Sequence, residues 1–144
     1  MTAQKENEDN LISGAMVASW VSQASFTPPG ITIAVAKERA VENLLHTGDH
    51  FALNILEQNN HQSLLKQFLQ SFKPGDNRFT DLEIKLSPGN QPLLNDALAW
   101  LEGTVNQRME CGDHWLIYAE IKHGKVIKKD GVTAVHHRKT GANY

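Results

Sequence analysis

Residues 13–37, SGAMVASWVSQASFTPPGITIAVAK, constrain the fold of this chain more than any other stretch. The run Pro28, Pro29 and Gly30 ends any strand that precedes it, because proline donates no hydrogen bond to a ladder. The half before this turn is rich in small and hydroxyl residues: Ser13, Gly14, Ala15, Ala18, Ser19, Ser22, Ala24 and Ser25. Small side chains let a flat ligand approach the backbone, and hydroxyl groups supply hydrogen-bond donors and acceptors. The same composition also suits a barrel strand that must bend or pack closely, so both interpretations stay open.

The size and charge of the chain restrict its class. We expect residues 1–144 to form one domain, because this length is typical of a single domain. The formal net charge is −2 and no basic block is present, so the sequence indicates no nucleic-acid partner. A single cysteine, Cys111, excludes an internal disulfide framework. The N-terminal residues are unlike a signal peptide and no apolar run approaches the roughly 18 residues of a membrane span, so we expect a cytoplasmic protein without membrane insertion.

Alternating apolar residues predict mainly β-structure. Ile31, Ile33 and Val35 alternate with smaller or polar residues, which is the pattern of a half-buried strand. Strands are expected at residues 11–24, 31–36, 50–56, 82–86, 97–109, 115–122 and 132–137, with turns at 110–113, 123–124 and 130–131 and loops at 73–77 and 87–95. Since tight turns join several of these strands, antiparallel pairing should dominate.

Two helices are expected beside the strands. Residues 38–47 carry apolar residues at helical spacing and end before Gly48, a residue typical of helix C-termini. Residues 61–72 carry an apolar stripe, with Asn60 in position to cap the helix. Residues 5–10, KENEDN, favour a turn. Together these elements predict a mainly β fold, a closed or partly closed Greek-key barrel with flanking helices.

Several familiar sites are absent from the sequence. There is no G-x-G-x-x-G motif and no P-loop, so neither a Rossmann dinucleotide site nor a Walker site is expected. There is also no G-x-S-x-G elbow of a hydrolase. His46 and His50 are separated by the expected helix end, and adjacent His136 and His137 would point to opposite faces of a strand. We therefore expect no metal site.

Two groups of polar residues are candidates for chemistry. His114 opens a strand directly after the turn at Gly112 and Asp113, where a histidine at a barrel rim could polarise a ligand or handle a proton. A partly exposed turn histidine without a role is the alternative. Lys37 and Arg39 lie at the start of an expected helix, whose N-terminus favours an anion such as a phosphate. Two solvated basic residues are the alternative there.

Taken together, these segments resemble the flavin reductase-like family, the FMN-binding split barrels. The resemblance covers residues 11–137, and its most specific part is the stretch 13–37. Further matches are HFALNIL at 50–56, PLLNDALAWLE at 92–102 and GDHWLIYAEI at 112–121. The segments ASWVSQASF and AVHHRKTG look most like the C-terminal flavin reductase domain of cyanobacterial flavodiiron proteins. Family members generally have another strand before the first matching segment, so we expect that strand to be missing here and the chain to be part of a larger multidomain protein.

The resemblance implies a set of cofactor-binding residues. The isoalloxazine and ribityl chain of FMN would contact Ala18, Ser19, Trp20, Ser22, Gln23, Ala24 and Ser25. The phosphate would lie near Ala36, Lys37 and Arg39, and Asn54 is a further candidate. His114 matches the histidine of the family's G-D-H motif, which lies near the flavin and the nicotinamide, and would be the catalytic residue.

The resemblance also implies an NAD(P)H-dependent flavin reductase. NADH or NADPH would transfer a hydride to N5 of bound FMN, so that the cofactor carries the chemistry. Electrons would then pass to a diiron oxygen-reducing module, which would share a longer chain with this domain and a flavodoxin-like domain. A homodimer is expected from the same resemblance. Two alternatives stay open: a non-catalytic flavin-binding or dimerisation module that relays electrons, and a split barrel for haem or a different flavin.

Overall fold

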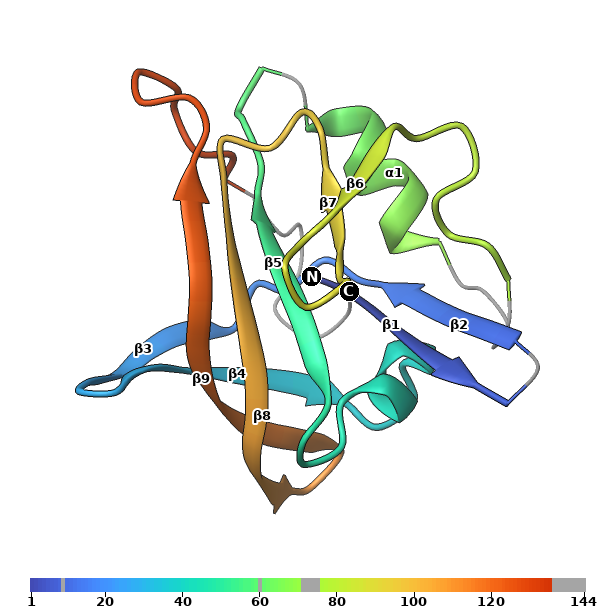
Figure 1. Ribbon diagram of the computed structural model, residues 1–144, viewed down its shortest axis with the longest axis vertical. Coiled ribbons are helices and arrows are strands. Elements are labelled where there is room, and N and C mark those ends of the chain that lie inside the picture. The colour runs from blue at the N-terminus through green and yellow to red at the C-terminus, as the bar shows by residue number, and fades with distance from the viewer. Residues whose placement is uncertain (9, 60, 71–75, 136–144) are drawn as a thin grey trace.

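The computed structural model describes residues 1–8, 10–59, 61–70 and 76–135 of the chain (Figure 1). The strands are β1 (Thr2–Asn7), β2 (Asn10–Ala15), β3 (Val21–Phe26), β4 (Pro29–Ala36), β5 (His50–Ile55), β6 (Ile84–Leu86), β7 (Pro92–Leu94), β8 (Ala99–Cys111) and β9 (His114–Val126). The helices are a 3-10 helix, η1 (Ala40–Leu44), and an α-helix, α1 (Gln62–Leu69). Among these described residues, no helix is long and apolar enough to cross a membrane.

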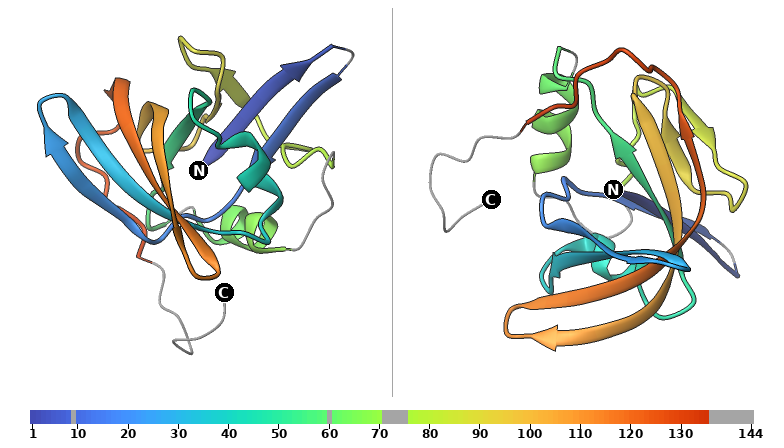
Figure 2. Two further views of the ribbon diagram at one scale, coloured as in Figure 1. Left: turned by 90° about the horizontal axis from the view of Figure 1, so that it is seen from below. Right: turned by 90° about the vertical axis from the view of Figure 1, so that its left-hand side faces the viewer.

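Seven strands form one antiparallel sheet in the order β2-β1-β5-β8-β9-β4-β3, and β6 pairs with β7 in a separate hairpin. Figures 1 and 2 show that this sheet is strongly curled: β8 and β9 run side by side, and β4 pairs with the first half of β9, from Gly30↔Glu120 to Ala36↔His114. The mainly β fold with antiparallel pairing is therefore confirmed.

The main hydrophobic core joins the curled sheet to η1. Ile31, Ile33 and Val35 of β4 are buried, whereas the residues that alternate with them are half-buried, as the pattern predicts: Thr32, Ala34 and Ala36. Other members of this core come from η1 and from the central strands: Val41, Leu44, Phe51, Leu53, Val105, Ile117 and Ala119. A second cluster contains Leu64 and Phe68 of α1 together with Leu94 of β7 and Ala15 of β2, so α1 packs where these strands end.

The N-terminal residues form a strand that the sequence did not predict. Residues 5–10 were expected to be a turn, yet β1 runs to Asn7 and pairs with β2 in a register from Thr2↔Ala15 to Asn7↔Asn10. Expecting the segment after residue 10 to lack a ladder partner was therefore wrong. The polar residues misled because only the first part of β1 is buried: Ala3 is fully buried, whereas Lys5 and Glu6 are exposed.

The expected strand at 11–24 is two strands at opposite edges of the sheet. β2 ends at Ala15, β3 begins at Val21, and residues 16–20 form a link between the two edges. The period-2 pattern could not indicate this break, because the small residues are distributed evenly along both strands and the link. We call residues 16–20 the small-residue link.

Other expected elements differ in extent. The helix at 38–47 is only the short η1, although Gly48 adopts the left-handed φ of +93° expected after a helix end. The loop at 87–95 contains β7, which pairs with β6.

The C-terminal part of the chain also differs from the expected pattern. The turn at 123–124 lies within β9, where Gly124 is paired with Leu101. In place of the strand at 132–137, Thr133 makes an isolated bridge to Glu57. His136, His137 and the expected cap Asn60 lie outside the described residues.

Candidate functional site

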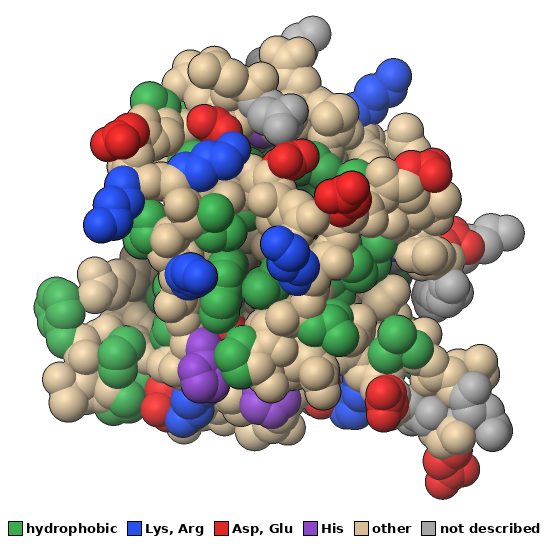
Figure 3. All heavy atoms as spheres, turned by 45° about the horizontal axis from the view of Figure 1, so that its top comes forward, with side chains coloured by type: hydrophobic (Ala, Val, Ile, Leu, Met, Phe, Trp, Pro, Cys, Tyr) green, Lys and Arg blue, Asp and Glu red, His purple; other side chains and the backbone are tan. Residues whose placement is uncertain are grey.

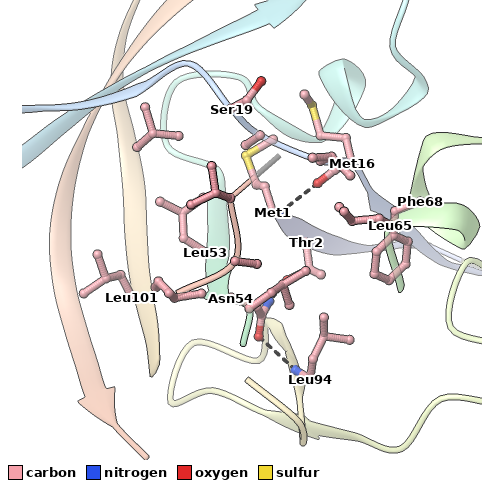
Figure 4. A pocket seen from close by; sticks show the side chains of 17 residues that line it. Met1, Thr2, Met16, Ser19, Leu53, Asn54, Leu65, Phe68, Leu94 and Leu101 are labelled. Carbon is pink, nitrogen blue, oxygen red and sulfur yellow. Dashed lines mark hydrogen bonds between the residues drawn. The ribbon is translucent and has the colours of Figure 1, made fainter. Parts of the chain in front are cut away.

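A cavity of about 510 Å³ lies between the small-residue link, the end of β5, α1 and residues 134–135 (Figure 4). Its walls are mainly apolar and include Met16, Val21, Leu53, Leu65, Phe68 and Leu101. The volume is within the range of small-molecule sites, roughly 300–1,000 Å³. The lining that the structure describes contains no lysine or arginine, so the cavity suits a flat ring system better than a phosphate.

The small-residue link brings Ala18 and Ser19 to the wall of this cavity. The link is held at both ends, because Met16 N donates to Met1 O at 2.9 Å and Ala34 N donates to Trp20 O at 3.0 Å. Ala18 packs against the main core and adds only a methyl group, so a ligand can come close to the backbone here. Ser19 lies at the edge of the cavity in Figure 4. The segment that the sequence indicated as ligand-facing therefore borders the cavity, while its binding role stays a prediction.

Asn54 also lines the cavity, but its amide is used by the protein itself. Leu94 N donates to Asn54 Oδ1 at 2.9 Å, and Asn54 Nδ2 donates to Thr2 Oγ1 at 3.0 Å and to Pro92 O at 3.4 Å. Figure 4 shows the bond from Leu94 at the side of the cavity away from Ser19. Asn54 thus ties β5 to β1 and β7 and fixes one wall of the cavity.

His114 lies in a cluster with Trp20 and Asp113. The His114 and Trp20 rings are 5.0 Å apart between centroids, with a tilt of 34°. His114 Nδ1 is 2.8 Å from Asp113 Oδ1, and the His114 side chain is only 15% exposed. Hydrogen bonding from His114, followed by its charge, lowers the pKa of Asp113 below the ordinary value. The cluster contains an imidazole, a carboxylate and an aromatic ring. These groups are suited to proton transfer and to stacking against a ligand ring.

Lys37 lies beside this cluster. Ala36 is paired with His114 across β4 and β9, and Lys37 N donates to Asp113 O at 2.9 Å. Lys37 Nζ forms an ion pair with Glu110 and lies 5.3 Å from the centre of the Trp115 ring. The hydrogen bond from Lys37 is the main reason that the pKa of Glu110 is lowered.

The remaining predicted residues lie elsewhere. Arg39 is the N-cap of η1. The pKa of Arg78 is lowered mainly because Arg78 is partly buried, and the positive charge of Arg39 lowers it further. Four predicted residues follow along the edge strand β3, and none of them lines the cavity: Ser22, Gln23 and Ala24, which are exposed, and Ser25, which is half-buried. The structure therefore brings Ala18, Ser19 and Asn54 together at the cavity, and Trp20, Ala36, Lys37 and His114 together beside it.

Sequence reasoning missed the far wall of the cavity. Leu65 and Phe68 of α1 and Ala134 and Val135 of the C-terminal segment complete it. Gln58 N donates to Val132 O at 2.9 Å, and Ala134 N donates to Leu56 O at 2.8 Å, which fastens that segment beside the end of β5. The apolar stripe of α1 was visible in the sequence, but nothing indicated which surface it faces.

Charges of both signs surround the apolar side chains on the face shown in Figure 3, in agreement with the net charge of −2. Within the described part of the chain, no group of three His, Cys, Asp or Glu residues could hold a metal ion.

Comparison with known proteins gives close relatives. The family described as flavin reductase like domain matches residues 1–142. Diflavin flavoprotein A 6 of Nostoc sp. strain PCC 7120 is 59% identical over 133 residues, which cover 92% of this chain and 23% of that protein. Diflavin flavoprotein A 1 of Synechocystis sp. strain PCC 6803 is 54% identical over 144 residues, covering 100% of this chain and 24% of that protein. The chain thus spans about a quarter of the length of these curated relatives.

Solved structures share the fold. The NADH:FAD oxidoreductase SgcE6 of Streptomyces globisporus has a TM-score of 0.77 at 23% identity, over 92% of this chain and 77% of that chain. The flavin reductase HpaC, solved in complex with NADP+, has a TM-score of 0.68 at 21% identity, over 90% of this chain and 78% of that chain. Because the family match spans nearly the whole chain and these relatives exceed half identity, the chain belongs to the flavin reductase-like domain family.

Proposed function

We propose that this chain is an oxidoreductase domain that binds FMN beside Ala18 and takes electrons from NADH or NADPH. The observation that carries the proposal is the small-residue link against a mainly apolar cavity of about 510 Å³. A flat ring can lie against the backbone of this link because Ala18 and Ser19 have short side chains. When bound, FMN supplies the hydride chemistry that the amino acids themselves lack.

The side chains around the cavity would shield and orient the ligand. Leu65 and Phe68 of α1 would exclude water from one wall, and the Ser19 hydroxyl would offer a hydrogen bond at the edge. The predicted binding residues Trp20, Ser22, Gln23, Ala24 and Ser25 would extend this surface from the cavity along β3. His114, whose ring contacts that of Trp20 at a tilt, would polarise the nicotinamide or handle a proton at the rim.

The phosphate of FMN would lie outside the apolar cavity, near Ala36, Lys37 and Arg39. Lys37, which pairs with Glu110 in this structure, and Arg39 would supply the positive charge that an anionic group requires. Asn54 would act mainly by fixing the cavity wall, because its amide already bonds to Leu94 and Thr2.

The relatives suggest the setting of this domain. We propose that it belongs to a longer cytoplasmic protein with flavodoxin-like and diiron modules, to which reduced flavin delivers electrons for oxygen reduction. A homodimer is proposed as well. Among the described strands, β3 is paired only with β4, and Phe26 at its end is 83% exposed, so this edge could be covered by a second copy.

One observation favours a second candidate function. His114 and Trp20 are not among the residues that line the cavity. A flavin-binding module that relays electrons from another protein, without using a nicotinamide, would fit this separation.

An anaerobic titration of the FMN-loaded chain with NADH and then NADPH tests the proposal. Flavin absorbance at its visible band should bleach with at least one nucleotide, and His114→Ala should slow the bleaching. His123→Ala serves as the matched control, because His123 is exposed on the same strand β9. Tight FMN binding without bleaching by either nucleotide would refute the reductase function and favour the relay.

A further inference from the structure

The two ring nitrogens of His114 are in different surroundings. Nδ1 lies 2.8 Å from the Asp113 carboxylate, whereas Nε2 is buried and has no hydrogen-bond partner among the described residues. The Trp20 ring lies against the imidazole, with 5.0 Å between the ring centroids. A buried ring nitrogen without a partner is costly unless a ligand group pairs with it, so this atom needs an explanation.

The backbone fixes the position of Asp113. Gly112 and Asp113 form the turn between β8 and β9, and Gly112 adopts a left-handed φ of +61°. Asp113 O accepts a hydrogen bond from Lys37 N at 2.9 Å, which anchors the turn to the end of β4. His114 follows at once and is paired with both Ala36 and Cys111. Asp113 therefore meets Nδ1 from a turn that is held on two sides.

The hydrogen bond determines which nitrogen carries the proton. A carboxylate only accepts, so Nδ1 must donate to Asp113. In the neutral ring, Nε2 then carries a lone pair and acts as an acceptor. The group that pairs with it must therefore offer an N–H or O–H.

We propose that Asp113 is a positioning residue that holds neutral His114 as the Nδ1–H tautomer, so that Nε2 accepts a hydrogen bond from an amide N–H of the ligand. The carboxamide of a nicotinamide carries such a group, and this part of the inference rests on the proposed function.

The charges around the ring keep Asp113 available as an acceptor. The pKa of Asp113 is lowered by the hydrogen bond from His114, then by the charge of His114, and to a smaller extent by Lys37. Asp113 is therefore ionised at neutral pH and available as an acceptor. Lys37 itself forms an ion pair with Glu110.

The tautomer can be measured directly in the chain without any nucleotide. Proton–nitrogen correlation spectra of the histidine rings, recorded at about pH 9 where histidine is ordinarily neutral, distinguish Nδ1–H from Nε2–H. We expect Nδ1–H for His114 in the wild type and in Asp113→Asn, which keeps an acceptor oxygen. Asp113→Ala should shift His114 toward Nε2–H, whereas Asp130→Ala, at another exposed turn, should leave it unchanged. The Nε2–H form in the wild type, or an unchanged tautomer in Asp113→Ala, would overturn the proposal.

A kinetic measurement tests the ligand half of the inference separately. If nicotinamide binds at Nε2, Asp113→Ala should raise the KM for the nucleotide about two- to fivefold, the range of an exposed polar pair, with FMN affinity unchanged. An unchanged KM in an active enzyme would remove the nicotinamide assignment. If the chain has no reductase activity, the proposed function fails, yet the tautomer spectra still decide the role of Asp113. Should Asp113→Ala not fold, the wild-type spectrum still tests the proposal, because the Nε2–H form there would refute it.

Discussion

Replacing Asn54 with alanine should destabilise the fold more than is usual for a residue that is only half-buried. The change removes the acceptor of the hydrogen bond from Leu94 N, and Leu94 is only 5% exposed. It also removes the amide that donates to Thr2 Oγ1. An unsatisfied buried N–H costs about 1–3 kcal/mol, and the lost bond to Thr2 adds about 1 kcal/mol. Thr2 Oγ1 keeps Pro92 O at 2.6 Å and Ala52 O at 3.3 Å, so it adds no further penalty. The free energy of unfolding should fall by about 2–4 kcal/mol in total.

Urea unfolding followed by circular dichroism measures this difference. Asn106→Ala is the control, because Asn106 is an exposed asparagine on β8, and it should change the free energy of unfolding by less than about 0.5 kcal/mol. If Asn54→Ala unfolds like the wild type while its FMN affinity falls at least about tenfold, Asn54 is a ligand and the structural argument is wrong.

Three further changes have defined outcomes. Phe51→Ala removes a fully buried ring from the main core and should lower the free energy of unfolding by about 3–5 kcal/mol in urea; a loss below about 1 kcal/mol would mean that the core is not as described. Gly131→Ala should lower Tm, because the new Cβ would overlap Leu98 Cδ2 and push the C-terminal segment away; an unchanged Tm would contradict this close packing. Lys37→Ala should raise the pKa of Glu110 toward its ordinary value in a carbon NMR titration. Since the pKa of Glu110 is lowered in the folded state, the pair stabilises the fold at pH values above the ordinary carboxylate pKa. This stabilisation is lost as the pH falls through the folded pKa of Glu110. An unchanged Glu110 pKa in Lys37→Ala would refute the pairing.

The sequence predicted those elements whose pattern is local. The alternation of Ile31, Ile33 and Val35 defines β4, because one face of the strand is buried and the other is not. The break at residues 16–20 was missed, because where a strand leaves one sheet edge for another depends on pairing partners far along the chain. The pairing of β1 with β2 was missed because its residues are largely polar and its partner provides the burial.

The candidate site, too, could be predicted from the sequence only where the pattern is local. Ala18 and Ser19 were predicted from their size, and they border the cavity. Ser22 to Ser25 have the same composition but lie along an exposed edge, because the chain direction changes at the link. The contributions of Phe68 and Ala134 depend on how α1 and the C-terminal segment pack, which neither periodicity nor composition specifies.

The central claim is that the cavity beside the small-residue link holds flavin. Quenching of FMN fluorescence on titration with the chain tests it most directly. We predict saturable binding of one FMN per chain. Ala18→Leu, which fills the cavity, should weaken it at least about fivefold, while Ser63→Leu on the exposed side of α1 should have no effect. Equal FMN affinity of the wild type and Ala18→Leu, or no saturable binding by the wild type, would contradict the claim.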